Sequence, residues 1–241
     1  MDLELIVKRF VKGLQYIDEN YNGPLDNVNF LPGLQPMYEH TTVKEILNWW
    51  IETYPNDFNP RNAYTNEYRY PNIQGARCDI VFSNNGKWLP AKPEWAIEVK
   101  RIQLVGNNGN NNDYGLPKIL SPYLKDRSLI HDIKRMQISN IAKKKVVLGY
   151  GFEYDFNSCR KARDLYPDRS NFIDNLENVC QRNDPHKGQL YLDPLIETVE
   201  ILLKSRKLVK GKCIIKKFNA WQHPCGGIGK VFAWEISNPK K

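Results

Sequence analysis

Three charged residues that interrupt apolar runs are the part of this sequence whose types and spacing could do chemistry. Asp79 lies within the run 77–82, and Glu98 and Lys100 lie within the run 95–100. Buried charges are costly unless they pair or bind a metal. Two carboxylates and one ammonium on one patch of a sheet therefore predict a site for a divalent cation and a phosphate group.

The spacing within the second run indicates which side chains share a face. Residues i and i+2 of a strand point to the same side, so Glu98 and Lys100 point one way while Ile97 and Val99 point into a core. An exposed hairpin at the edge of a sheet is the alternative. The apolar neighbours, beginning with Trp95, make the strand too hydrophobic for a wholly solvated edge.

These residues resemble the PD-(D/E)xK nuclease superfamily, which holds most type II restriction endonucleases and many repair and recombination nucleases. Asp79 matches the first acid of the pattern, and Glu98-Val99-Lys100 matches its acid-x-Lys. The stretch 84–87 supplies the turn between them, because Asn-Gly favours a hairpin. The residue before Asp79 is Cys78, so the proline of the pattern is absent. The resemblance covers roughly residues 40–155.

The resemblance implies an α/β fold of restriction-endonuclease-like type, with a mixed central sheet flanked by helices. It implies a Mg²⁺-dependent DNA endonuclease, most like a type II restriction enzyme, in which Mn²⁺ can substitute. Asp79, Glu98 and the backbone carbonyl of Val99 would be metal ligands. Lys100 would orient the attacking water, stabilise negative charge, or act as a base, and the sequence leaves these roles open.

Two further residues are weaker candidates. Many members of the superfamily contribute a glutamate from the helix before the sheet, which makes Glu45 a possible additional acid. However, the stretch from Thr42 to Glu45 also has the pattern of a capping box, and we favour that structural role. His131 lies on the helix that should follow the motif, where a lone histidine is usually packed or exposed.

The charge of the chain is positive and uneven. The net charge is +8, yet residues 1–70 hold six Lys/Arg and ten Asp/Glu, which leaves 29 against 17 in the remainder. A basic body suits a polyanion such as nucleic acid, although ordinary solubility charge explains it equally well. The candidates for contacts with nucleic acid are Lys134, Arg135, Lys143, Lys144 and Lys145. Cations near the C-terminal dipole of a helix are the alternative for the lysine run.

The length of 241 residues suits one domain, with a core at about residues 40–155 and helix and strand additions at both ends. Apolar spacing predicts helices over 3–20, from near 42 to 54, 127–142 and 194–208, and strands over 146–150, 213–218 and 230–236. Residues 55–76 form a polar approach to the first motif strand that is rich in Tyr and Asn, and residues 157–190 are polar and predicted to be irregular. The Gly/Asn run 106–117 is either a loop that touches DNA or a surface insertion.

Partners and location follow from the same features. Five scattered cysteines without a C-x-x-C motif indicate a reducing compartment, and no signal peptide or membrane span is evident, so we expect a cytoplasmic protein. Cleavage of double-stranded DNA at symmetric sites implies a homodimer. The alternatives are a repair or recombination nuclease, a nucleic-acid-binding protein that keeps the fold without cleavage, and a globular protein with a chance motif.

Overall fold

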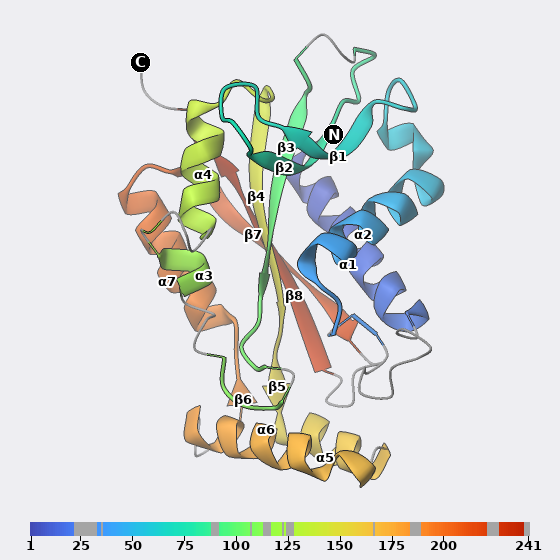
Figure 1. The fold of residues 1–241 in the computed structure, drawn as a ribbon, viewed down its shortest axis with the longest axis vertical. Helices are drawn as coiled ribbons and strands as arrows, with labels where there is room; N and C mark the ends of the chain where they lie inside the picture. Colours follow the sequence, from blue (N-terminus) through green and yellow to red (C-terminus); the bar gives the residue numbers. More distant parts are fainter. Residues whose placement is uncertain are drawn as a thin grey trace.

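The fold is an α/β arrangement built on one mixed sheet (Figure 1). The computed structural model describes residues 1–21, 33–34, 36–87, 92–106, 108–112, 117–121, 123, 128–165, 167–183, 189–220 and 227–238. The strands of the six-stranded sheet are β1 (Tyr64–Arg69), β2 (Arg77–Phe82), β3 (Trp95–Ile102), β4 (Lys144–Phe152), β8 (Gly227–Ile236) and β7 (Val209–Ala220), in that spatial order. The β3–β4 pair is parallel and the other pairs are antiparallel.

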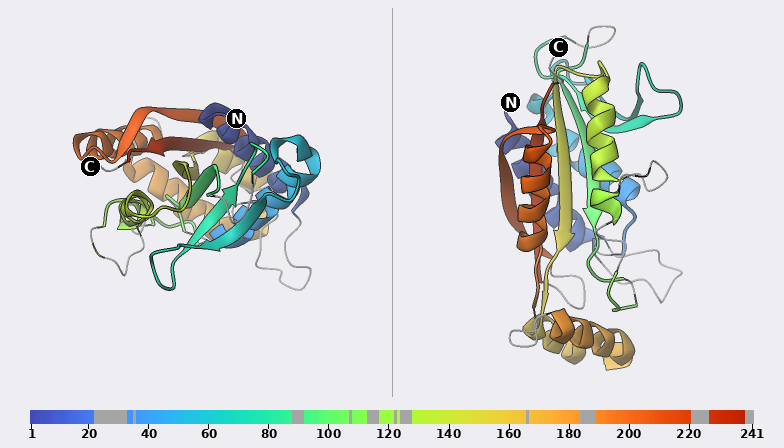
Figure 2. Two further views of the ribbon diagram at one scale, coloured as in Figure 1. Left: turned by 90° about the horizontal axis from the view of Figure 1, so that it is seen from above. Right: turned by 90° about the vertical axis from the view of Figure 1, so that its left-hand side faces the viewer.

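Helices cover both faces of this sheet, as the two views of Figure 2 show. The helices are α1 (Leu3–Asn20), α2 (Glu39–Thr53), α3 (Pro117–Leu120), α4 (Leu129–Ile138), α5 (Phe156–Leu165), α6 (Ser170–Asn183) and α7 (Asp193–Ser205). Alternation along β3 sends Ile97 and Val99 into the core shared with α1 and α2, while Ala96 and Ile102 join the core under α4 and α7. Because both faces are covered, the strand is apolar on both sides, and its charged residues stand out.

The start of α2 corrects one prediction. The helix begins at Glu39, not near Thr42, and Tyr38 is its N-cap. The hydroxyl of Thr42 donates to the carbonyl of Tyr38 at 3.1 Å. The backbone amide of Thr42 donates to the same carbonyl. Thr42 therefore lies inside the first turns of the helix, and the capping-box interpretation of Thr42 and Glu45 is wrong.

Regular structure occurs in two segments for which the sequence predicted no helix or strand. Strand β1 lies within residues 55–76, at the edge of the sheet, and helices α5, from Phe156, and α6 occupy much of residues 157–190. The two helices pack on each other through a small set of apolar residues, namely Cys159, Ala162, Ile173, Leu176, Val179 and Cys180. They lie at the end of the long strand β4, beyond the sheet (Figure 1). The remaining predicted elements occur, and β4, β7 and β8 are longer than predicted.

The described cysteines and helices bear on two further expectations. Cys78, Cys159, Cys180 and Cys213 are free thiols. Among the described helices, none combines the length and the apolar character that crossing a membrane requires. Gly86 has a φ of 77°, in the left-handed region that favours glycine, as expected for the Asn-Gly turn.

The end of α7 has an unusual residue at a glycine position. Its last turn closes with two reverse hydrogen bonds, from the amide of Lys207 to the carbonyl of Lys204 and from the amide of Leu208 to the carbonyl of Leu203, both at 2.9 Å. This is a Schellman motif, in which the residue at the position of Lys207 takes a left-handed conformation and is usually glycine. Lys207 has a φ of 57°, so a lysine bears the strain that glycine avoids.

We expect Lys207→Gly to stabilise the protein. Relief of the left-handed backbone should outweigh the greater freedom of glycine in the unfolded chain, for a gain in the free energy of unfolding of about 0.5–1 kcal/mol. Urea unfolding followed by circular dichroism measures this. The matched control is Lys217→Gly, at an exposed position of β7 without a positive φ, which should lose about 0.5–1 kcal/mol. A loss of stability in Lys207→Gly equal to that of the control would contradict the interpretation.

Candidate functional site

The site forms where β2 and β3 separate. Their antiparallel pairing ends at Ile80 and Ile97, while β3 continues beside β4 as far as Ile102. Alternate amides of a strand point to the same edge, so those of Val99 and Arg101 face the side that β2 has left. Backbone amides away from water need an acceptor, and here no strand supplies one.

Two carboxylates supply the missing acceptors. Oδ2 of Asp79 accepts a hydrogen bond from the amide of Val99 at 2.6 Å, and Oε2 of Glu39 accepts one from the amide of Arg101. Asp79 comes from β2 itself, and Glu39 is the first residue of α2. The carbonyl of Met37, just before α2, accepts from the Arg101 guanidinium, which ties the start of the helix to the same edge.

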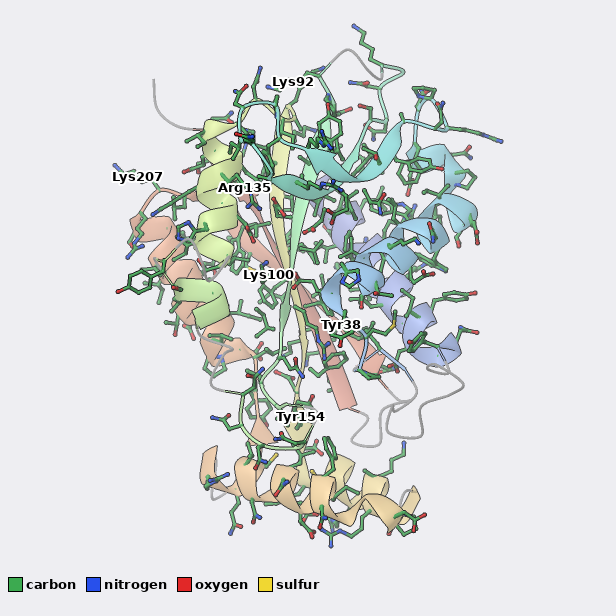
Figure 3. All side chains as sticks on the ribbon, in the orientation of Figure 1. Tyr38, Lys92, Lys100, Arg135, Tyr154 and Lys207 are labelled. Carbon is green, nitrogen blue, oxygen red and sulfur yellow. The ribbon has the colours of Figure 1, made fainter. Side chains whose placement is uncertain are left out.

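Glu98 and Lys100 lie on the face of β3 that is turned toward α4. Glu98 is only 3% exposed. Its Oε1 accepts hydrogen bonds from the Tyr70 hydroxyl at 2.6 Å and from Arg135 at 2.7 Å. Nζ of Lys100 lies 3.1 Å from Oδ2 of Asp132 and 3.6 Å from Oε1 of Glu39. In Figure 3, Lys100 lies near the middle of the molecule, between the labelled Arg135 and Tyr38.

Helix α4 supplies the remaining charges. Asp132 and Arg135 are three residues apart, so they share one side of the helix, and they pair with each other at 2.8 Å. Asp132 is 3% exposed and holds Arg135 through one oxygen and Lys100 through the other. The complete group, called the site cluster below, has four carboxylates and two cations, namely Glu39, Asp79, Glu98, Asp132, Lys100 and Arg135.

Burial and neighbouring charges together change the acidity of the site cluster. Burial, and then the nearby charge of Glu98, raises the pKa of Asp79 well above its usual value. The same two causes raise the pKa of Asp132 to about 7. Burial alone would lower the pKa of Lys100, but the carboxylates of Glu39 and Asp132 outweigh it and raise the pKa. Asp79 accepts its hydrogen bond from the amide of Val99, the residue between Glu98 and Lys100, so the three predicted catalytic residues lie in one cluster.

The donor set fits Mg²⁺. Among the described residues, no three side chains of His, Cys, Asp or Glu are grouped as a metal site. The set expected from the resemblance has only two carboxylates, Asp79 and Glu98, with the carbonyl of Val99. In a strand the N–H and C=O of one residue point the same way, so that carbonyl faces the edge where Asp79 lies. Hard oxygen donors and uncompensated negative charge suit Mg²⁺, which retains several waters.

The helix acid that reaches the site is Glu39, which the sequence analysis missed. Glu45 lies six residues farther along α2, about 1.7 turns away, and is half-buried. Glu39 follows a loop and begins its helix without a side-chain capping bond, so neither periodicity nor a capping motif marks it. His131 is half-buried on α4, and its amide donates to the N-cap hydroxyl of Ser128.

The five predicted contacts with nucleic acid have different environments. Lys134 and Lys143 are exposed, whereas Arg135 belongs to the site cluster. Lys144 lies 3.8 Å from Glu94 and over the ring of Trp95. Lys145 is only 6% exposed, and its ammonium donates to the carbonyl of Ser139 at 2.8 Å. Lys145 is therefore a buried structural residue, which corrects its assignment as a surface contact.

The Gly/Asn run is only partly described, because residues 107 and 113–116 lie outside the described part of the chain. The carbonyl of Asn108 accepts from the side chain of Asn175 on α6 at 2.9 Å. A Cβ on Gly109 would lie 2.2 Å from the carbonyl oxygen of Phe172, so this stretch packs tightly against α6. Its described portion is thus anchored to the α5–α6 pair.

No protein-family model matches the chain, and no curated protein or solved structure matches it. The resemblance to the nuclease superfamily therefore rests on Asp79, Glu98, Lys100 and the strands that carry them. Function has to be inferred from the positions and charges of these residues and of their neighbours.

The metal-free protein should lose stability as pH rises. Protonation favours the folded state when a carboxyl has a higher pKa folded than unfolded, so the benefit is complete below about pH 4 and disappears as pH passes the folded value. For Asp132 that value is about 7, and Asp79 shifts in the same direction. Urea unfolding in EDTA between about pH 5 and 8 should show a falling free energy of unfolding. A rise over this range would contradict the burial of these acids.

Asp79→Asn should stabilise the metal-free protein at pH 8, because it replaces a carboxyl whose charged form burial and Glu98 both disfavour with a neutral amide. The amide oxygen can still accept from Val99. The control is Glu45→Gln, a half-buried acid on α2 outside the site cluster, which should change stability little. Equal effects of the two substitutions would show that Asp79 carries no unusual electrostatic strain.

Proposed function

We propose that this protein is a Mg²⁺-dependent DNA endonuclease with a restriction-endonuclease-like fold, most like a type II restriction enzyme. The observation that carries the proposal is the convergence of Asp79, Glu98 and Lys100, from two separating strands, with the further acids Glu39 and Asp132. A structural ion pair needs one acid for each base. This group has an excess of carboxylates, as a site for a divalent cation requires.

The proposed roles follow from the contacts. Asp79, Glu98 and the carbonyl of Val99 would hold the metal, which when bound supplies an activated water and neutralises charge on the phosphate. Lys100 is held by carboxylates on both sides, Glu39 and Asp132. These pairs favour the ammonium form, so we assign Lys100 to stabilising the negative charge that develops at the scissile phosphate. Arg135 adds a second cation beside Glu98.

The proposed substrate is double-stranded DNA. The excess of cations beyond residue 70 suits a polyanion, and exposed lysines such as Lys134 and Lys143 lie on α4 and just after it. Cleavage of both strands at a symmetric site would require a homodimer, because the two-fold axis of the protein has to match that of the DNA. A repair or recombination nuclease would use the same cluster on an asymmetric substrate.

One contact favours a second candidate function, nucleic-acid binding without cleavage. Oε1 of Glu98 already accepts hydrogen bonds from Tyr70 and Arg135, which occupy an oxygen that a metal would use. Incubation with plasmid DNA in Mg²⁺, with EDTA as the control, separates the candidates. Discrete bands support a restriction enzyme, a smear supports a nonspecific nuclease, and unchanged plasmid supports binding alone.

Lys100→Ala should separate cleavage from binding. Loss of the ammonium should lower the cleavage rate by roughly 10²-fold or more, the scale of losing one acid–base or electrostatic group, while DNA binding survives. Paired assays measure this, a gel shift in Ca²⁺ and cleavage in Mg²⁺. Asp79→Asn and Glu98→Gln should also impair cleavage, and Glu45→Gln is the matched control that should not. Cleavage by Lys100→Ala at the wild-type rate would show that this strand is not the active site.

A further inference from the structure

The segment that begins in the last turn of α7 and continues into β7 is strongly basic. From Lys204 to Lys217 there are seven Lys/Arg and no Asp/Glu. Some of these cations pair with acids elsewhere, as Lys204 does with Glu200 at 2.6 Å. Arg206 and Lys207, in contrast, are exposed and form no ion pair with any described residue. Their charge is therefore available to a partner.

These cations line a pocket of about 680 Å³. The pocket lies between the end of α7, the start of β7, α4 and the chain after β8, and its polar lining includes Gln137, Lys204, Arg206, Lys207, Ser237 and Asn238. Among the described residues that line it, none is acidic. Cations together with neutral hydrogen-bonding groups suit the oxygens of a phosphate.

Helix α4 links this pocket to the site cluster. Arg135 belongs to the cluster and Gln137, two residues farther on, lines the pocket, where its side chain donates to the carbonyl of Ser237 at 3.1 Å. Figure 2 shows α4 between α7 and the β1–β2 pair, and Figure 3 shows Lys207 on the outer side of α4. Lys134, exposed on α4, adds a cation between the two places.

The backbone at Lys207 gives an independent indication. Cations at the end of a helix interact well with its dipole, and lysines on an edge strand such as β7 prevent unwanted pairing. Those two effects explain Lys204 and the lysines of β7. Neither requires a side chain at the left-handed position of Lys207, where glycine is the usual residue. Residues that break a local rule of this kind are concentrated at functional sites.

We propose that Arg206 and Lys207, with the pocket that they line, bind the phosphate backbone of the nucleic acid on the far side of α4 from the site cluster. The choice of nucleic acid as the ligand rests on the proposed function. The strand that enters the site would pass over α4, and the pocket would hold a phosphate outside the scissile one. This surface would contribute affinity without reading bases.

The test uses the double variant Arg206→Ala/Lys207→Gly in the full-length protein. Fluorescence anisotropy with a labelled DNA duplex in EDTA, over a series of salt concentrations, measures binding without cleavage. Loss of two phosphate contacts should weaken binding roughly tenfold near 0.1 M salt and reduce the slope of log affinity against log salt by about 2. The matched control is Lys8→Ala on α1, which removes an exposed cation on the opposite face of the sheet.

The outcomes separate this inference from the proposed function. Weaker binding and a shallower salt slope in the double variant, with both unchanged in Lys8→Ala, support the surface. Equal affinities of the wild type and the double variant overturn it, even if the wild type cuts DNA in Mg²⁺. Pocket-dependent binding to anionic lipid vesicles but not to the duplex also overturns it. A wild type that binds DNA through this pocket but never cuts it overturns the nuclease proposal and leaves the surface supported.

Discussion

Two backbone amides left without a strand partner are the constraint on which the candidate site depends. Where β2 separates from β3, the amides of Val99 and Arg101 would be unsatisfied, at about 1–3 kcal/mol each when buried. The acceptors for these two amides are the carboxylates of Asp79 and Glu39 rather than the carbonyls of a neighbouring strand. The same two hydrogen bonds complete the edge of the sheet and fix the acids in place. The hydrogen bonds that complete the edge of the sheet are therefore the same ones that set the positions of the site's carboxylates.

The choice of carboxylates has an electrostatic consequence that reaches α4. Acids held at the edge of β3, together with Glu98 in the core, would repel one another strongly in a poorly solvated region. Lys100 and Arg135 offset part of this repulsion, and Asp132 holds both cations in position. Because Asp132 brings its own charge, carboxylates still outnumber cations. Burial, and then the charge of Glu98, raises the pKa values of Asp79 and Asp132. Such clusters of perturbed groups are typical of functional sites.

The sequence predicted the parts of the site that depend on neighbours along the chain. Alternation on β3 placed Glu98 and Lys100 on one face, and the structure confirms it. Glu39 was missed because its contact with Arg101 spans 62 residues and no local motif marks it. Asp132 was missed because an acid on a helix is ordinarily solvated. Lys145 shows the opposite error, since a lysine run suggests a surface while the start of β4 is already buried.

The missed elements of the fold have a similar cause. Strand β1 is an edge strand whose six residues are all half-buried or exposed, in no regular alternation, so its sequence lacks the period of two. Helices α5 and α6 bury only a narrow set of residues against each other, which a polar composition conceals. In both cases tertiary contacts, rather than local propensity, decide the structure.

Two arrangements that are unfavourable for local stability lie on either side of α4. Together they indicate why this helix is important to the proposed function. Toward β3, carboxylates crowd against Glu98 in a space where apolar side chains would pack without repulsion. Toward α7, Lys207 holds a left-handed conformation that glycine would adopt without strain. The crowded carboxylates form an environment that favours cations. Lys207 places a cation in a pocket that favours anions. Under the proposed function, a helix that separates these two environments would suit a ligand that brings a metal ion and a run of phosphates together, as a nucleic acid does.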